Sequence, residues 1–278
     1  MKQIDFTSPT AQKDFTDSLK NTGFAVVKNH IIDQKLIAEV FKEWEVFFNS
    51  NYKMNYLYNN DTQDGLFPMT VSEKAVGYDV KDIKEFYHYY TWGQYPNELS
   101  NKTKELRHQM NEVAVTLLNW IEEYLPNEIK QNLSEHLSSM VNNSDMTLLR
   151  VLHYPPLTGN EETNAIRASA HGDINLITVL VAASQSGLQL KDNNGSWIDV
   201  PVDPGMLAIN IGDMLETATN GFYKSTLHRV INPVNEKKHL SRYSIPLFLH
   251  PRSDVKLTPN KTAGEFLDER RRALGIMK

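Results

Sequence analysis

The sequence predicts a mixed α and β fold in which helices come first and a set of short strands follows. Between residues 146 and 250 the chain is a series of short apolar runs separated by turn signals, which is typical of a barrel or a jelly roll. Two long segments before residue 146 carry apolar residues at spacings of three and four, the pattern of amphipathic helices. We expect residues 1–278 to form one unit.

The composition provides for a buried core and excludes several classes of partner. Of the 278 residues 40% are hydrophobic, and 29 basic residues stand against 34 acidic ones, for a net charge of −5. This balance argues against a nucleic-acid or anionic-membrane partner. The first residues, MKQIDFTSPT, are polar, and the longest apolar run, LITVLVAA, is too short to cross a bilayer. The sequence therefore predicts no membrane segment. We expect a cytoplasmic protein that acts as a monomer.

The first helix and the first strand are predicted from local signals. Ser8 and Pro9 suit the start of a helix, and Gly23 suits its end. The run GFAVVKNH then predicts a strand. A second helix is predicted from one apolar stripe, made of Leu36, Ile37, Val40, Phe41, Trp44, Phe47 and Phe48.

Residues 51–105 are the least regular part of the chain, and long segments of this kind are usually functional or mobile. Their centre, DIKEFYHYYTWGQYP, offers candidates for the wall of a substrate pocket, namely Phe86, Tyr87, His88, Tyr89, Tyr90 and Trp92. The alternative is a half-buried strand whose alternate rings pack on the sheet.

A third helix is predicted from a long apolar stripe that stops before Pro126, and we expect it to pack across the outside of the sheet. The stripe consists of Leu106, Met110, Val113, Ala114, Leu117, Leu118, Ile121 and Leu125. A shorter helix is expected over residues 129–137. The long stripe offers no carboxylate pair with a matching histidine, which argues against a helical di-iron site.

A candidate metal site lies in the run AHGDINLITVLVAA. His171 and Asp173 are two residues apart, so on a strand their side chains leave the same face and can chelate one ion. His228 is the natural third ligand, because it follows a Gly-rich turn and lies in another β-type run, STLHRVI. The absence of cysteine leaves only His, Asp and Glu as ligand types. Two imidazoles and a carboxylate make the facial triad of non-haem Fe(II) oxygenases, and zinc is the alternative metal.

A second motif, R-x-S, opens the strand-like run RYSIPLFL. Alternation puts Arg242 and Ser244 on one face, where a guanidinium and a hydroxyl can hold a carboxylate. Arg167 lies four residues before His171 and could share its face. We expect Arg167 either to bind a substrate acid or to form a surface ion pair.

These motifs carry a resemblance that covers nearly the whole chain. YPP, H-x-D, GLQL, W-I-D-V-P, N-I-G-D-M-L, N-G-x-Y-K-S-T-x-H-R-V and R-Y-S, in this order, resemble the isopenicillin N synthase-like 2-oxoglutarate-dependent Fe(II) dioxygenases. The resemblance implies a double-stranded β-helix (jelly-roll) core at residues 146–250. A helix-rich region, residues 1–145, would precede it, and a carboxy-terminal helix within residues 251–278 would close one catalytic unit.

The resemblance also implies an activity and its cofactors. Fe(II), 2-oxoglutarate and O2 would be used to oxidise a small-molecule substrate, by hydroxylation in the simplest case, with release of succinate and carbon dioxide. His171, Asp173 and His228 would bind the iron, and Arg242 with Ser244 would bind the distal carboxylate of 2-oxoglutarate.

Further roles follow from the same resemblance. Tyr154 takes the position of a tyrosine that commonly approaches the cosubstrate, whereas Leu152 replaces the usual asparagine. His153 would point to the opposite face and serve the structure. Asp213 would also be structural. The substrate-binding candidates are Arg167, Phe86, Tyr87 and His88.

Two other functions are considered. A relative that keeps R-x-S can dispense with the keto acid, as isopenicillin N synthase and aminocyclopropane carboxylate oxidase do. A non-catalytic jelly-roll binding module is the more distant alternative, and it would not need the triad together with R-x-S.

The end of the chain predicts a capped helix and an exposed turn. Thr262 and Glu265 form a capping box, and the basic run Arg270, Arg271 and Arg272 is expected on a solvated face. In relatives this tail often folds over the barrel mouth, so it is also a candidate lid. The run NPVNEKKHL, between the last histidine of the triad and R-x-S, predicts an exposed hairpin tip.

Overall fold

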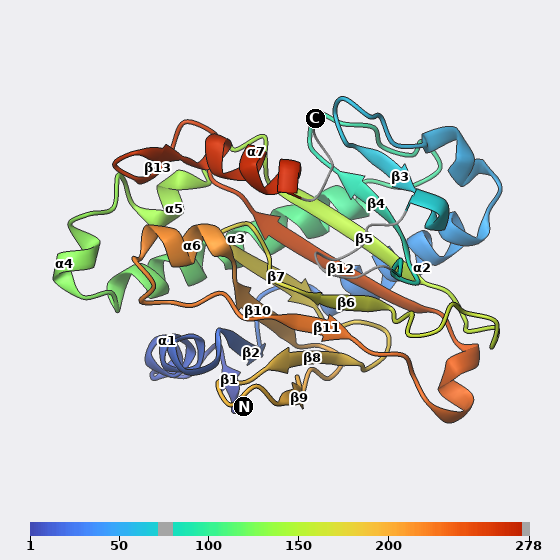
Figure 1. Cartoon of the computed structure of the whole chain (residues 1–278), viewed down its shortest axis with the longest axis horizontal. Helices are drawn as coiled ribbons and strands as arrows, with labels where there is room; N and C mark the ends of the chain where they lie inside the picture. The colour runs from blue at the N-terminus through green and yellow to red at the C-terminus, as the bar shows by residue number, and fades with distance from the viewer. Residues whose placement is uncertain (72–79, 274–278) are drawn as a thin grey trace.

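The computed structural model describes residues 1–71 and 80–273 (Figure 1). Part of the irregular segment 51–105, residues 72–79, therefore lies outside the described residues. So do the last five residues of the segment 251–278, which were assigned to the carboxy-terminal helix. None of the described helices is both long enough and apolar enough to cross a membrane.

Two facing sheets build the jelly-roll core. The larger has eight strands in the order β1-β2-β10-β7-β12-β5-β4-β3. Its strands are β1 (Gln3–Asp5), β2 (Phe24–Lys28), β3 (Gly65–Phe67), β4 (Glu85–Tyr89), β5 (Leu148–Tyr154), β7 (Ile177–Val181), β10 (Leu207–Ile211) and β12 (Arg242–Leu249). The smaller sheet, in the order β6-β11-β8-β9, consists of β6 (Ala168–His171), β8 (Leu188–Lys191), β9 (Trp197–Asp199) and β11 (His228–Val230).

The amino-terminal region is rich in helices, as expected, and it also contributes strands to the core sheet. β1 pairs with β2, which runs antiparallel to β10 of the core, and β3 pairs with β4, which runs antiparallel to β5. The strand predicted from GFAVVKNH is present as β2. The aromatic run of residues 85–89 forms β4, so it extends the core sheet.

Helices flank the core sheets (Figure 1). They are α1 (Ala11–Thr22), α2 (Gln34–Asn49), α3 (Lys102–Glu123), α4 (Asn127–Lys130), α5 (Leu137–Met140), α6 (Asp213–Ala218) and α7 (Ala263–Ala273), with 3-10 turns η1 (Tyr52–Tyr56), η2 (Met69–Val71) and η3 (Asn235–His239). A hairpin of β13 (Lys256–Thr258) and β14 (Lys261–Thr262) precedes α7. In Figure 1, α3 runs behind the sheet, and it contacts β7 and β12 as expected.

The apolar stripes of α2 and α3 are confirmed. Every predicted stripe residue of α3 is buried, and those of α2 are buried or pack against the same core. Gly23 ends α1 as predicted: its φ of 69° lies in the left-handed region, and its N–H donates to the carbonyl of Leu19. Residues 235–239, the predicted hairpin tip, form the turn η3, and its described side chains are exposed.

Two helix predictions need correction. α1 begins at Ala11 rather than after Ser8, because the N–H of Ser8 closes a turn on the carbonyl of Asp5. Residues 129–137 are not one helix. α4 and α5 are separate single turns, and a new helix begins at Leu137, whose N–H donates to the carboxylate of Glu122 at 2.7 Å.

Strand alternation divides the molecule into a structural face and an interior face. On β12 the odd-numbered residues Tyr243, Ile245, Leu247 and Leu249 join the helix-side core. Arg242 and Ser244 therefore leave the other face, toward the small sheet. A smaller apolar cluster lies on that inner side, made of Phe67, Phe86, Leu152, Tyr154, Ala168 and Val230.

Candidate functional site

The three predicted metal ligands lie together although they come from distant parts of the chain. His171 ends β6 and His228 begins β11, and the two are directly paired in the small sheet. Their ring centroids are 4.4 Å apart, and His228 Nε2 lies 3.7 Å from Asp173 Oδ1. One ligand atom from each of the three residues lies within 4.8 Å of the others, so a single ion can reach all three.

Backbone carbonyls orient both imidazoles. The Nδ1–H of His171 donates to the carbonyl of Ser169 at 2.7 Å, and that of His228 donates to the carbonyl of Thr226 at 3.2 Å. Each Nε2 is then left as the basic nitrogen. Burial, helped by the neighbouring His228, lowers the pKa of His171 to about 4. His171 is therefore neutral at physiological pH, the form that binds a metal.

The carboxylate of Asp173 is held through one oxygen. Oδ2 accepts hydrogen bonds from Thr178 Oγ1 at 2.5 Å and from Asn210 Nδ2 at 2.7 Å. Thr178 and Asn210 are directly opposed on β7 and β10. Burial alone would raise the pKa of Asp173, but the two imidazoles and these donors hold it below its ordinary value. The carboxylate is therefore ionised, with Oδ1 turned toward His228.

Sequence reasoning did not identify Thr178 and Asn210 as site residues. The available signal was a polar side chain within each of two apolar strands, LITVLV and LAINI. A buried polar group in such a run needs a partner, and here the partner is a candidate ligand.

Asp213 supports the loop of Asp173 from its backbone. Its N–H donates to the carbonyl of Asp173 at 2.8 Å, at the start of α6. The preceding Gly212 approaches the loop so closely that a Cβ there would lie 2.1 Å from the carbonyl oxygen of Asn175. The Asp213 carboxylate instead forms an ion pair with Arg270 at 3.0 Å. It is outside the ligand cluster, as its predicted structural role requires.

The R-x-S pair lies on the inner face of β12. Arg242 stands opposite Tyr154 and Ser244 opposite Leu152 on β5. The Arg242 guanidinium carbon lies 5.0 Å from the centroid of the Tyr154 ring, and its Nε donates to the carbonyl of Gln185 at 3.0 Å. Its Nη1 is buried without a hydrogen-bond partner among the described residues. A buried donor of this kind is suited to a carboxylate ligand.

A cavity of about 620 Å³ opens from His171 and Asp173, a size that suits a small molecule. Its described lining has apolar and aromatic parts, with five cationic and three acidic side chains. Lining residues include Lys84, His88, Tyr90, Arg150, Trp197 and His250. Neither Arg242 nor Ser244 is among the described residues that line this cavity.

The aromatic segment divides between the two faces of β4. His88 lines the cavity, where its Nε2 accepts from Arg150 Nε at 2.8 Å. Phe86 lies beneath, with the Arg150 guanidinium carbon 4.6 Å from its ring centroid. Tyr87 was a substrate candidate, and here a correction is needed: it is buried in the helix-side core, because neighbours on a strand face opposite ways. Trp92 is half exposed and lies outside the described lining.

One of the two expectations for Arg167 is wrong, and the other, the binding of a substrate acid, stays a prediction. Arg167 is fully buried, and within the described residues it forms no ion pair, so a surface ion pair is excluded. It is not among the described residues that line the cavity. It lies beside Arg242 instead, with its guanidinium carbon 5.9 Å from the Tyr154 ring centroid.

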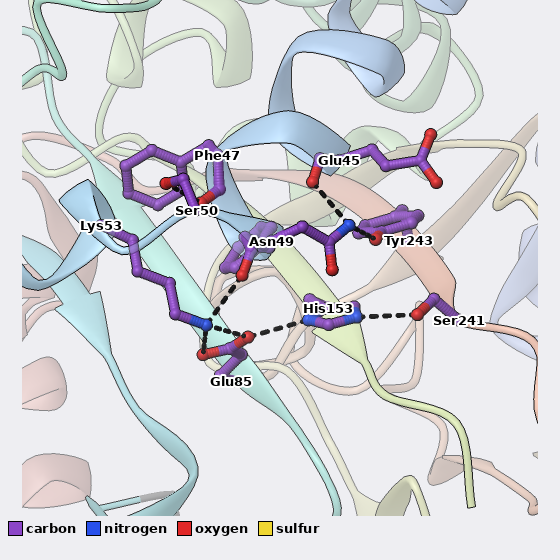
Figure 2. Close-up of polar contacts among 10 residues, drawn as sticks. Glu45, Phe47, Asn49, Ser50, Lys53, Glu85, His153, Ser241 and Tyr243 are labelled. Carbon is purple, nitrogen blue, oxygen red and sulfur yellow. Dashed lines mark hydrogen bonds and ion pairs between the residues drawn. The ribbon is translucent and has the colours of Figure 1, made fainter.

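His153 lies on β5 next to Tyr154, and its side chain is on the helix-side face of that strand. Figure 2 shows its ring between Glu85 and Ser241, with Lys53 on the far side of Glu85. The Nδ1–H of His153 donates to Glu85 Oε1 at 2.8 Å, and Lys53 Nζ lies 3.0 Å from both carboxylate oxygens. Its ring stacks on Tyr243 of β12 at 4.8 Å. The predicted opposite orientations of His153 and Tyr154 are present.

The carboxy-terminal helix covers part of the cavity. α7 begins with the predicted capping box: Glu265 Oε2 accepts from the N–H of Thr262 at 2.8 Å, and Thr262 Oγ1 accepts from the N–H of Glu265 at 3.2 Å. Arg270 and Arg272 are exposed, as expected for a solvated basic face, and Arg270 and Arg271 also line the cavity.

Comparison with known proteins places these features in a family. The profile of the 2OG-Fe(II) oxygenase superfamily matches residues 138–251, and that of the non-haem dioxygenase in morphine synthesis N-terminal region matches residues 4–112. A Shewanella oneidensis crystal structure described as an oxygenase is 49% identical with a TM-score of 0.90, over 100% of this chain and 99% of that one.

Two other relatives are similar over different lengths. A Caulobacter crescentus structure described as a 2OG-Fe(II) oxygenase family protein is 31% identical, covers 98% of both chains and has a TM-score of 0.78. The 2-oxoglutarate-dependent dioxygenase citB of Monascus ruber is 38% identical over 124 residues. That match covers 44% of this chain and 36% of the Monascus protein, so the chain spans about a third of that relative's length.

Proposed function

Because the chain belongs to the 2OG-Fe(II) oxygenase superfamily, we propose that it oxidises a small molecule, by hydroxylation in the simplest case, at the expense of 2-oxoglutarate and O2. One oxygen atom would enter the product and the other succinate, with loss of carbon dioxide. The observation that carries the proposal is the cluster of His171, Asp173 and His228, of which His171 and Asp173 line the cavity.

The donor set fits Fe(II). We propose that His171 Nε2, His228 Nε2 and Asp173 Oδ1 hold the metal, since the other polar atom of each side chain already has a protein partner. Three protein ligands on one face leave positions for cosubstrate and oxygen. Bound Fe(II) would supply the oxidising chemistry, with 2-oxoglutarate and O2 as co-reactants.

The cosubstrate's distal carboxylate is assigned to Arg242 and Ser244. The support is the buried Nη1 of Arg242, which has no hydrogen-bond partner among the described residues. Tyr154 would pack against the cosubstrate chain, and the neighbouring Leu152 adds apolar surface. A non-catalytic binding module would not need a buried guanidinium with an open donor in addition to three candidate metal ligands.

The substrate is proposed to bind in the cavity of about 620 Å³. Its described lining combines rings and aliphatic side chains with more cationic than acidic groups, so small acids with an apolar body come first in a screen. Residues 1–278 are proposed to act as one catalytic unit, since β2 and β4 extend the core sheet. Action as a cytoplasmic monomer is part of the same proposal.

The proposal is tested by measuring succinate released from 2-oxoglutarate by the Fe(II)-loaded protein. Small carboxylic acids, amino acids and ring compounds are added in turn, with Asp173→Ala as the inactive control. A substrate is expected to accelerate succinate formation and to yield one oxidised molecule per succinate. No succinate above the Asp173→Ala control, with or without added compounds, would contradict the proposed function.

A further inference from the structure

Two arginine side chains are buried together beside one tyrosine. Arg167 and Arg242 are 0% and 2% exposed. Their guanidinium carbons lie 5.9 and 5.0 Å from the centroid of the Tyr154 ring. Arg167 directly precedes β6 of the small sheet, whereas Arg242 opens β12 of the large sheet. The two sheets therefore bring one cation each to the same interior point.

The groups around these cations are neutral. Arg167 Nη2 donates to the carbonyl of Leu240 at 3.0 Å, and Nη1 lies 3.5 Å from Gln185 Oε1. Arg242 Nε donates to the carbonyl of Gln185 at 3.0 Å. In the part of the chain that the structure describes, neither arginine is paired with a carboxylate. Arg167 Nε and Arg242 Nη1 are both buried there without a hydrogen-bond partner.

This arrangement is unfavourable in the absence of a ligand. Buried charges are normally paired or fully hydrogen-bonded, and two like charges near each other add repulsion. Burial and the charge of Arg242 lower the pKa of Arg167 to about 10, so it still carries its charge at neutral pH. A role confined to bonding the Leu240 carbonyl would need only a neutral donor. The second positive charge is therefore explained by an anion that binds between the two arginines.

We propose that Arg167 is a second binding residue for the distal carboxylate of 2-oxoglutarate, which it shares with Arg242. The assignment depends on the function proposed above, because it takes the keto acid as the occupant. The cosubstrate fits better than the substrate, since neither arginine is among the described residues that line the substrate cavity. Tyr154 belongs to the inner apolar cluster, together with Leu152 and Val230, so apolar side chains lie near the same point and strengthen a charge-assisted hydrogen bond there.

The test compares two keto acids in anaerobic titrations of the Fe(II) protein, followed by the visible charge-transfer band of the bound keto acid. The ligands are 2-oxoglutarate and 2-oxopentanoate, which has a methyl group in place of the distal carboxylate. Arg167→Met removes the charge. Arg167→Gln also removes it but keeps a neutral donor for the Leu240 carbonyl. Arg107→Met is the matched control: Arg107 on α3 is half-buried and donates from Nη2 to the carbonyl of Thr147 at 3.2 Å.

Each Arg167 variant is expected to weaken 2-oxoglutarate binding by about 10- to 100-fold, the range for one lost hydrogen bond to a charged group. Binding of 2-oxopentanoate should change by less than about twofold, and Arg107→Met should affect neither ligand. If Arg167→Met does not fold, Arg167→Gln provides the same comparison.

Two results would overturn the assignment of Arg167. One is an unchanged dissociation constant for 2-oxoglutarate in the folded variants. The other is equal weakening for both keto acids, which would mean that Arg167 only shapes the site. A wild-type protein that shows no band with 2-oxoglutarate would instead contradict the proposed function, so the two failures are distinguishable.

Discussion

Removing one hydrogen bond to Asp173 should weaken Fe(II) binding without changing any ligand. Thr178→Val keeps the shape of the side chain and deletes the hydroxyl that donates to Asp173 Oδ2 at 2.5 Å. Asn210 still donates to the same oxygen at 2.7 Å, so the carboxylate keeps one of its two donors. A hydrogen bond to a charged group contributes about 1.5 to 3 kcal/mol, which corresponds to a Kd for Fe(II) raised by about one to two decades.

The same change should alter the pH dependence of metal binding. Thr178 helps to hold the pKa of Asp173 below its ordinary value, so its removal raises that pKa. Because only the ionised carboxylate binds the metal, the Fe(II) binding curve of Thr178→Val should move to higher pH. The loss of affinity relative to wild type should therefore be largest at low pH.

The assay is anaerobic competition for Fe(II) between the protein and a chromophoric chelator, repeated over a pH series. Thr103→Val is the matched control, because Thr103 is fully buried and its Oγ1 accepts from Trp44 Nε1 at 3.0 Å, in the helix-side core. The control should lose stability and keep its affinity for Fe(II). An equal affinity in Thr178→Val, Thr103→Val and wild type at every pH would refute this account of Asp173.

Three more predictions follow from particular contacts. Arg242→Lys should raise the Kd for 2-oxoglutarate by about 10- to 100-fold and leave Fe(II) binding intact, because lysine keeps the charge but loses the two parallel N–H donors of the guanidinium. An unchanged midpoint in the 2-oxoglutarate titration would show that another residue binds the distal carboxylate. His88→Ala should change the KM for the substrate found in the succinate screen and spare uncoupled succinate formation. Tyr87→Ala should instead destabilise the fold by about 3 to 5 kcal/mol in urea unfolding, and the reverse pattern would contradict the two faces of β4. Burial alone would raise the pKa of Glu85, but hydrogen bonds, above all the one from His153, lower this pKa below 4.5. The ionised Glu85 therefore stabilises the fold fully above pH 4.5, and this stabilisation is lost as the pH falls further. The difference in unfolding free energy between wild type and Glu85→Gln, measured by urea unfolding, should therefore shrink below pH 4.5. A difference that stays constant with pH would contradict the stabilising role of the Glu85 carboxylate.

Features that depend on near neighbours in the chain could be predicted from the sequence. The stripes of α2 and α3, the left-handed Gly23 and the capping box of α7 each reflect interactions within a few residues. The candidate metal site could also be predicted, because the residue types and the two-residue spacing of His171 and Asp173 allow both side chains to bind one ion. The distant third ligand, His228, was predicted from its place in another short β-type run, and the resemblance to a family agreed with it.

Features that depend on long-range pairing could not be predicted. Alternation along β4 separates Tyr87 from His88, but only the pairing of β4 with β5 decides which face meets the helices. A charged side chain is normally expected at the surface, so the sequence left a surface ion pair open for Arg167 beside the binding of a substrate acid, and only the folded chain shows its complete burial. The donors to Asp173 likewise become recognisable only when β7 and β10 are side by side.

The central claim is that His171, Asp173 and His228 together hold one Fe(II). The most direct measurement is the iron stoichiometry and affinity of the wild type and of the three single alanine variants, determined by anaerobic titration. The account predicts one tightly bound Fe(II) per chain in the wild type and loss of most binding in each variant. Full iron occupancy with unchanged affinity in Asp173→Ala would contradict it.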